Sequence, residues 1–148
     1  MFTSILVPTD GGPLSRKATR AAATLAKSIK AKVTSIYVTP PFHMVVAYDV
    51  YVPPNLLTAE NYDAAVAKSA AKVLAQAEKV CKEDGIPWEG MHVSNDSPHQ
   101  AIIAAAKRKR CDLILMASHG RRGIAAVVLG SETNKVLTHS KIPVLVYR

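Results

Sequence analysis

Short apolar runs rich in β-branched residues alternate with longer amphipathic segments along this chain. Strands are expected at residues 3–9, 32–38, 88–93, 112–117 and 143–147. Helices are expected at residues 13–30, 58–84, 97–108 and 131–140. In the first two helices, apolar side chains recur every three or four residues, the period of an amphipathic helix. Residues 39–57 are rich in proline and aromatic residues without any period, so an irregular loop is expected there.

This alternation of strands and helices predicts an α/β fold. The strand at 112–117 is apolar on both faces, which is typical of a parallel sheet covered by helices on both sides. With the strand order 3-2-1-4-5, the fold is a three-layer, Rossmann-like sandwich whose order reverses between the first and fourth strands. Ligands of such sheets bind at the carboxyl ends of the strands, beside the reversal. At 148 residues, the chain is expected to form a single domain spanning residues 1–148.

Two segments with candidate binding chemistry follow the first and fourth strands, and both are expected at the reversal. Asp10 directly follows the first strand, where its carboxylate would either bind a ligand or cap the first helix. The sequence Ala117-Ser118-His119-Gly120 begins at the last residue of the fourth strand, and Gly130-Ser131 comes after nine further residues, at the start of the last helix. Glycines let the backbone approach phosphate oxygens, and the amides of a helix N-terminus attract their charge. A nucleotide site is therefore predicted.

The formal charge of +8 changes this picture little. The basic residues are spread along the chain, and the densest run, 107–110, would end a helix, where cations complement the helix dipole. Specific nucleic-acid binding is therefore not expected, although this charge can attract nucleic acid non-specifically. Cys81 and Cys111 are expected to be buried, reduced thiols, and the five histidines are too scattered to predict a metal site.

A cytoplasmic location without membrane association is expected. No apolar stretch approaches the roughly 20 residues that a membrane helix needs. The N-terminal residues run directly into the first strand and lack the charged start of a signal peptide.

The chain resembles the bacterial universal stress protein family along its whole length. The residues that carry the resemblance are Ile5-Leu6-Val7-Pro8-Thr9-Asp10-Gly11, Ser118-His119-Gly120-Arg121-Arg122-Gly123, Leu129-Gly130-Ser131 and Ile142-Pro143-Val144-Leu145-Val146. The resemblance implies the five-stranded α/β sandwich described above and a homodimer. In its nucleotide-binding branch, the pattern G-x2-G-x9-G-[S/T] holds ATP, which implies ATP as the ligand here, with Mg²⁺ carried by its phosphates.

The resemblance also implies roles for individual residues. The implied nucleotide-binding residues are Pro8, Thr9, Asp10, Val38, Met116, Ala117, His119, Gly120, Arg121, Arg122, Gly130, Ser131, Glu132 and Thr133. Asp10 would meet the ribose or the base, Val38 would offer its backbone to adenine, and Met116 would line the base pocket. The loop after the fourth strand and the start of the last helix would bind the phosphates.

Two residues depart from the family pattern. Ala117 replaces its first glycine, and Gly12 stands where the family commonly has serine. The methyl group of Ala117 would either crowd the nucleoside or be tolerated, if the backbone angles there are ordinary. Glycine is still an acceptable cap for the first helix.

No catalytic residue is expected. His119 has no carboxylate beside it in sequence, and the chain shows no dedicated nucleophile or acidic metal cluster. The expected function is ATP binding rather than turnover, in stress response or signalling. The alternatives are a dimeric interaction module that does not bind nucleotide and a slow ATPase.

Two segments outside the nucleotide-binding motifs also have expected roles. The last strand, 143–147, would be an exposed sheet edge unless it paired with another chain. Antiparallel pairing with the same strand of a second copy would satisfy it, and the family resemblance implies this homodimer. Residues 39–57 would either fold over the nucleotide as a lid or bind a protein partner that the sequence does not identify.

Overall fold

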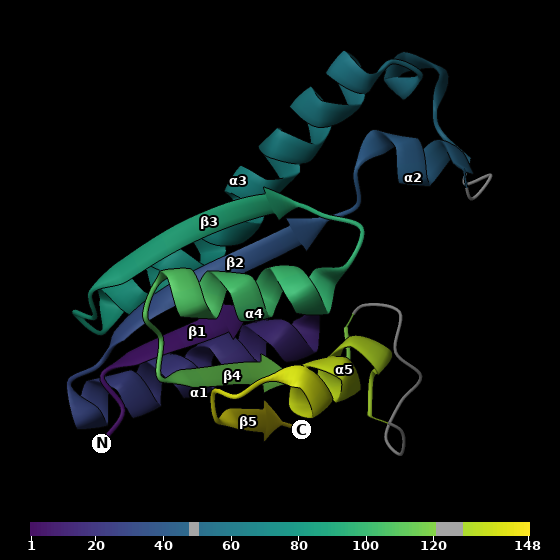
Figure 1. The fold of residues 1–148 in the computed structure, drawn as a ribbon. Helices are drawn as coiled ribbons and strands as arrows, with labels where there is room; N and C mark the ends of the chain where they lie inside the picture. The colour runs from purple at the N-terminus through teal and green to yellow at the C-terminus, as the bar shows by residue number, and fades with distance from the viewer. Residues whose placement is uncertain (48–50, 121–128) are drawn as a thin grey trace.

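The computed structural model describes residues 1–47, 51–120 and 129–148. Its strands and helices alternate as the sequence predicts (Figure 1). In chain order they are β1 (Ser4–Pro8), α1 (Pro13–Ile29), β2 (Lys32–Thr39), α2 (Phe42–Ala47), the 3-10 helix η1 (Pro54–Leu56), α3 (Ala59–Glu83), β3 (Trp88–Ser94), α4 (Pro98–Arg108), β4 (Leu113–Ala117), α5 (Ser131–His139) and β5 (Val144–Tyr147).

The five strands form one parallel sheet in the order β3-β2-β1-β4-β5. Ile5 of β1 lies beside Val33 of β2 on one side and beside Leu113 of β4 on the other. The chain therefore extends the sheet outward from β1 in one direction, then crosses back to build β4 and β5. This arrangement confirms the predicted fold class and places the reversal between β1 and β4.

Two apolar cores lie on opposite faces of the sheet, because successive strand residues point to opposite sides. On one face, Val7 and Leu115 pack against α1 and α3. On the other face, Leu6, Ile114 and Met116 pack against α4 and α5. All five residues of β4 are buried, which explains why this strand is apolar without alternation.

Both cysteines are buried and free, as predicted. Burial, with a smaller contribution from the charge of Asp84, raises the pKa of the Cys81 thiol to about 11. The Cys81 thiol therefore stays protonated at neutral pH and packs as an apolar group.

The segment predicted to be an irregular loop contains two short helices, so the prediction is wrong for residues 42–47 and 54–56. The ring of Phe42 packs against Tyr62 of α3, with 5.5 Å between the ring centroids. The Tyr62 hydroxyl also donates a hydrogen bond to the carbonyl of Pro40 at 2.8 Å. A helix as short as α2 is not stable alone, so these contacts with α3 explain why it forms.

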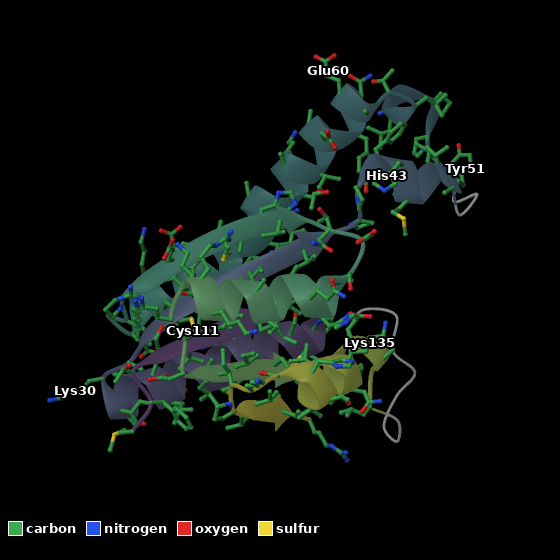
Figure 2. The ribbon with its side chains drawn as sticks, in the orientation of Figure 1. Lys30, His43, Tyr51, Glu60, Cys111 and Lys135 are labelled. Atoms are coloured by element: carbon green, nitrogen blue, oxygen red, sulfur yellow. The ribbon has the colours of Figure 1, made fainter. Side chains whose placement is uncertain are left out.

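The helices α2 and η1 and the N-terminal part of α3 project beyond the sheet and form an arm (Figure 1). Glu60 lies at the outer end of α3, while His43 and Tyr51 belong to the α2 side of the arm (Figure 2). Helix α3 has 25 residues, yet neither it nor any other helix in the described parts of the chain is long and apolar enough to cross a membrane.

Candidate functional site

A pocket of about 750 Å³ opens at the carboxyl end of the sheet, beside the reversal of strand order. This volume is within the usual range for small-molecule sites. Every predicted site residue that the structure describes lines the pocket: Pro8, Thr9, Asp10, Val38, Met116, Ala117, His119, Gly120, Gly130, Ser131, Glu132 and Thr133. Arg121 and Arg122 lie outside the described residues. The structure therefore brings residues from distant parts of the sequence to one pocket.

Five lining residues were not predicted: Ser15, Ile36, Tyr37, Pro98 and Ile102. Two signals could have found most of them. Ile36 lies two residues before Val38, so both side chains share one face of β2. Pro98 and Ile102 lie in the first turns of the helix after β3, which meets the same end of a parallel sheet as the other loops.

Asp10 is held in place by the turn between β1 and α1. Its Oδ1 accepts hydrogen bonds from the Gly12 amide at 2.8 Å and from the Ser15 hydroxyl at 2.7 Å. Gly12 is the N-cap of α1 and has no side chain to offer, so Asp10 and Ser15 stabilise this helix start instead. The other carboxylate oxygen lies near Gly120, where an added Cβ would be 3.0 Å from it. The capping role expected as one alternative for Asp10 is thus present in the structure.

The segment after β4 closes directly onto the start of α5. The Gly130 amide donates a hydrogen bond to the carbonyl of Ser118 at 2.7 Å. One turn later, the buried Thr133 hydroxyl donates to the carbonyl of Ala117 at 3.0 Å. The N-cap of α5 is Gly130, which provides no side-chain cap for the first amides of this helix. These amides therefore lie at the pocket in the arrangement that suits an anion.

The methyl group of Ala117 points away from the apolar wall of the pocket. Ile36, Val38 and Ile102 form this wall, and they pack with Met116 on the α4 and α5 face of the sheet. Ala117 belongs to the opposite core, under α1 and α3. It is also absent from the described residues that adopt a positive φ. Alanine therefore fits the backbone at this position and takes no space from the wall.

We expect Ala117→Gly to bind nucleotide no more tightly than the natural sequence. The change removes the methyl group of a residue that is only 8% exposed and adds backbone freedom to a strand, so the free energy of unfolding should fall by about 1 kcal/mol. Denaturant unfolding and calorimetry with AMP and ATP measure the two effects. Binding that appears only in the glycine variant would show that the methyl group blocks the pocket.

Glu132 joins the N-termini of α4 and α5. Its Oε2 accepts a hydrogen bond from the His99 amide at 2.9 Å and lies 3.3 Å from His99 Nδ1. Its Oε1 accepts from Lys135 Nζ at 2.8 Å. Partial burial alone would raise the pKa of Glu132, but the bonds from Lys135 and the His99 amide outweigh it and hold this pKa below its ordinary value. The carboxylate is therefore charged at neutral pH.

His119 Nδ1 lies 3.2 Å from the Ser118 hydroxyl. Across the described residues, no three His, Cys, Asp or Glu side chains are grouped so that they could hold a metal ion. None of the described residues from 40 to 57 lines the pocket, so the lid interpretation of this segment has no contact to support it.

The fold and the pocket define a doubly wound α/β protein with a ligand-sized site at the reversal of its sheet. The model of the universal stress protein family matches residues 1–148. The chain therefore belongs to the universal stress protein family.

Relatives and solved structures agree with this membership. Universal stress protein YxiE of Bacillus subtilis is 32% identical over 151 residues, which cover all of both chains. The structure of UspA from Lactobacillus plantarum is similar with a TM-score of 0.76 at 26% identity, over 99% of this chain and 97% of that one. Protein MJ0577 of Methanocaldococcus jannaschii has the same fold, with a TM-score of 0.79 at 23% identity over 99% and 95% of the two chains.

Two of the similar structures are nucleotide complexes. A universal stress protein in complex with cAMP has a TM-score of 0.70 at 24% identity, over 99% of this chain and 97% of that one. The universal stress protein from Archaeoglobus fulgidus in complex with dAMP also has a TM-score of 0.70, at 17% identity over 99% and 98% of the two chains.

Proposed function

We propose that this protein binds an adenine nucleotide in the pocket between β1 and β4, and that it acts in stress response or signalling through the bound state rather than by turnover. One observation carries the proposal: an apolar wall, a fixed carboxylate and an uncapped helix N-terminus line the same pocket. An apolar wall suits a base, a carboxylate accepts from ribose hydroxyls or an amine, and helix amides suit phosphate. The cAMP and dAMP complexes of related folds support this proposal.

Within the proposed site, the residues keep the roles that the family pattern implies. Asp10 would meet the ribose or base, while Ser131 and Thr133 at the start of α5 would meet phosphate. Arg121 and Arg122 remain proposed phosphate contacts. ATP with Mg²⁺ is the ligand that the family resemblance implies.

We also propose a homodimer that forms through β5. This strand pairs with β4 on one side and ends the sheet, and Leu145 at its centre is 41% exposed. Antiparallel pairing with the β5 of a second copy would cover this edge. Sedimentation velocity should give the mass of two chains, and a monomer at micromolar concentration would contradict this part of the proposal.

We also propose that the protein is located in the cytoplasm, as expected from the sequence, and cell fractionation tests this location.

Calorimetry on protein stripped of bound nucleotide tests the binding function. Adenosine, AMP, cAMP, ADP and ATP, the last with and without Mg²⁺, are titrated separately, and GMP serves as the control for the base. At least one adenine ligand is expected to bind more tightly than GMP. A folded protein that binds none of them at millimolar concentration would overturn the proposed function.

A further inference from the structure

The end of the sheet opposite the pocket carries an excess of positive charge. Four segments meet at this end, each running from the last turn of a helix to the second residue of the next strand: residues 26–33, 80–89, 105–114 and 136–145. They contain nine lysines and arginines against four aspartates and glutamates, and all of these charged residues are described. Lys30 lies at this end and extends away from the body of the protein, whereas Lys135 lies at the pocket end (Figure 2).

Most of these cations are not neutralised by a neighbouring carboxylate. Lys27 pairs with Asp84 and Lys109 with Glu89, and Lys82 pairs within α3. The other six form no ion pair with any described residue: Lys30, Lys32, Lys107, Arg108, Arg110 and Lys141. The first five belong to the segments that lead into β2 and β4, the two strands that flank β1. We call these five residues the basic edge.

One carboxylate, that of Asp112, lies at the basic edge. Its oxygens accept hydrogen bonds from the Thr3 amide at 2.9 Å and from the Ser4 amide at 2.9 Å. Partial burial alone would raise the pKa of Asp112, but the bonds from Ser4 and Thr3 outweigh it and hold this pKa below its ordinary value. The carboxylate is therefore charged, and it offsets only one of the five cations.

Two cations of the basic edge occupy positions that favour glycine. Helices α1, α3 and α4 end in the same way: the residue after a left-handed position donates its amide to a carbonyl in the last turn, at 2.8–2.9 Å. The left-handed residue is Gly85 after α3, but Lys30 after α1 and Arg110 after α4, with φ angles of +58° and +53°. No other non-glycine residue in the described part of the chain has a positive φ. A cation kept where glycine would be more stable points to a role in binding.

An aromatic ring lies between the two halves of the basic edge. Phe2 precedes Thr3, whose carbonyl accepts from the Lys32 amide at 3.0 Å and whose hydroxyl donates to Asp112 at 2.8 Å. These bonds fix the backbone beside Phe2 between the start of β2 and the segment that carries Arg110. The Phe2 residue is 37% exposed, so part of its ring is open to solvent while most of it is covered.

We propose that the basic edge binds single-stranded nucleic acid without sequence preference, with its lysines and arginines on the phosphates and Phe2 stacked on a base. Cations around an aromatic ring are the combination that single-strand surfaces use. A duplex keeps its bases stacked on one another and leaves the ring without a partner. An anionic bilayer would require an apolar side chain that enters it, whereas most of Phe2 is covered. This surface is separate from the pocket, so the inference goes beyond the proposed function.

Fluorescence anisotropy with a labelled oligodeoxythymidine of about 16 nucleotides tests this binding. The probe contains no adenine, and excess AMP is expected not to displace it. Between about 50 and 200 mM salt, the logarithm of the affinity should fall with a slope near −3 against the logarithm of the salt concentration, as about four phosphate contacts require. A duplex of the same length should bind more weakly, and so should vesicles that contain anionic lipid.

The double variant Lys30→Gly/Arg110→Gly tests the two left-handed cations. It should bind the probe roughly tenfold more weakly and reduce the salt slope to about −1.5, because two phosphate contacts are lost. Its melting temperature should rise by about 2–4 °C per substitution, because glycine suits both φ angles. Lys68→Gln/Lys72→Gln is the control for charge, since it removes two exposed lysines of α3 that lie outside the four segments and form no ion pair with described residues. This control should bind like the natural sequence.

Phe2→Leu separates a single strand from a membrane. Leucine keeps an apolar side chain but removes the ring, so probe affinity should fall roughly fivefold or more with an unchanged salt slope. Equal probe affinity in Phe2→Leu, or tighter binding to duplex or vesicles, would overturn the inference. So would displacement by AMP, equal losses in the two double variants, or a lower melting temperature in Lys30→Gly/Arg110→Gly, which would mark these side chains as structural. Failure to bind the probe leaves adenine binding at the pocket untouched.

Discussion

Gly130→Val is expected to abolish nucleotide binding at the pocket, with AMP affinity lower by roughly a hundredfold or more. A Cβ at this position would lie 3.0 Å from both the Cα of His119 and the carbonyl oxygen of Ser118. Both atoms belong to the backbone and cannot rotate away as a side chain can. The chain must therefore separate at the contact where the Gly130 amide bonds to Ser118 at 2.7 Å, which moves the start of α5.

Calorimetry with AMP measures the loss, and circular dichroism with thermal unfolding shows whether the variant remains folded. Overpacking of this kind costs about 1–3 kcal/mol of stability, so a folded protein is expected. Thr138→Val is the matched control, because it adds valine to the same helix at an exposed position outside the pocket lining. Gly130→Ala should fall between the natural sequence and valine. Unchanged AMP affinity in folded Gly130→Val would mean that phosphate does not bind at this loop.

Local patterns along the chain predicted the strands and helices, and the strand order 3-2-1-4-5, with which the family resemblance agrees, then predicted the place of the pocket. Parallel strands end at one edge, so residues that directly follow strands, such as Asp10 and Gly120, must meet there whatever the exact packing. The buried run in β4 and the alternation of strands and helices depend on short-range sequence alone. This explains why residues more than a hundred positions apart could be placed in one pocket without a structure.

The features that the sequence did not predict depend on contacts between distant residues. Helix α2 forms because Phe42 packs on Tyr62, and its own six residues carry no helical period. Glu132 was expected among the nucleotide-binding residues, but its bond to the His99 amide joins positions 33 residues apart in different helices. Such a pairing leaves no local pattern. It becomes visible only when α4 and α5 are packed together.

The direction of the Ala117 side chain could be predicted only in part from the sequence. Strand alternation requires Met116 and Ala117 to face opposite sides of the sheet, so the sequence already contained the answer. Deciding which side carries the pocket required the positions of Ile36 and Ile102, which the structure provides. The departure from the family pattern at residue 117 therefore changes the core under α1 more than it changes the pocket.

Gly11→Ala is expected to destabilise the protein by about 2–4 kcal/mol, and Gly85→Ala by only about 1 kcal/mol. Both glycines have positive φ angles, +74° and +68°, so alanine pays a similar backbone cost at each. Their surroundings differ. A Cβ on Gly11 would lie 2.8 Å from Val73 Cγ2 of α3, whereas a Cβ on Gly85 would have no neighbour within 4 Å. The difference between the variants therefore measures how tightly α3 packs on the turn that carries Asp10.

Thermal and denaturant unfolding measure the two stabilities, and about 2–4 °C per kcal/mol is expected for a chain of this size. The double variant Gly11→Ala/Val73→Ala completes a mutant cycle, since it removes the γ-carbons that the new methyl group would meet. The cycle also needs the single variant Val73→Ala. If crowding by Val73 causes the excess loss, the double variant loses less stability than the losses of Gly11→Ala and Val73→Ala add up to. Equal losses for Gly11→Ala and Gly85→Ala would show that the φ angle alone requires glycine at residue 11. Because Gly11 follows Asp10, a shift of this turn should also weaken AMP binding in Gly11→Ala and leave it unchanged in Gly85→Ala.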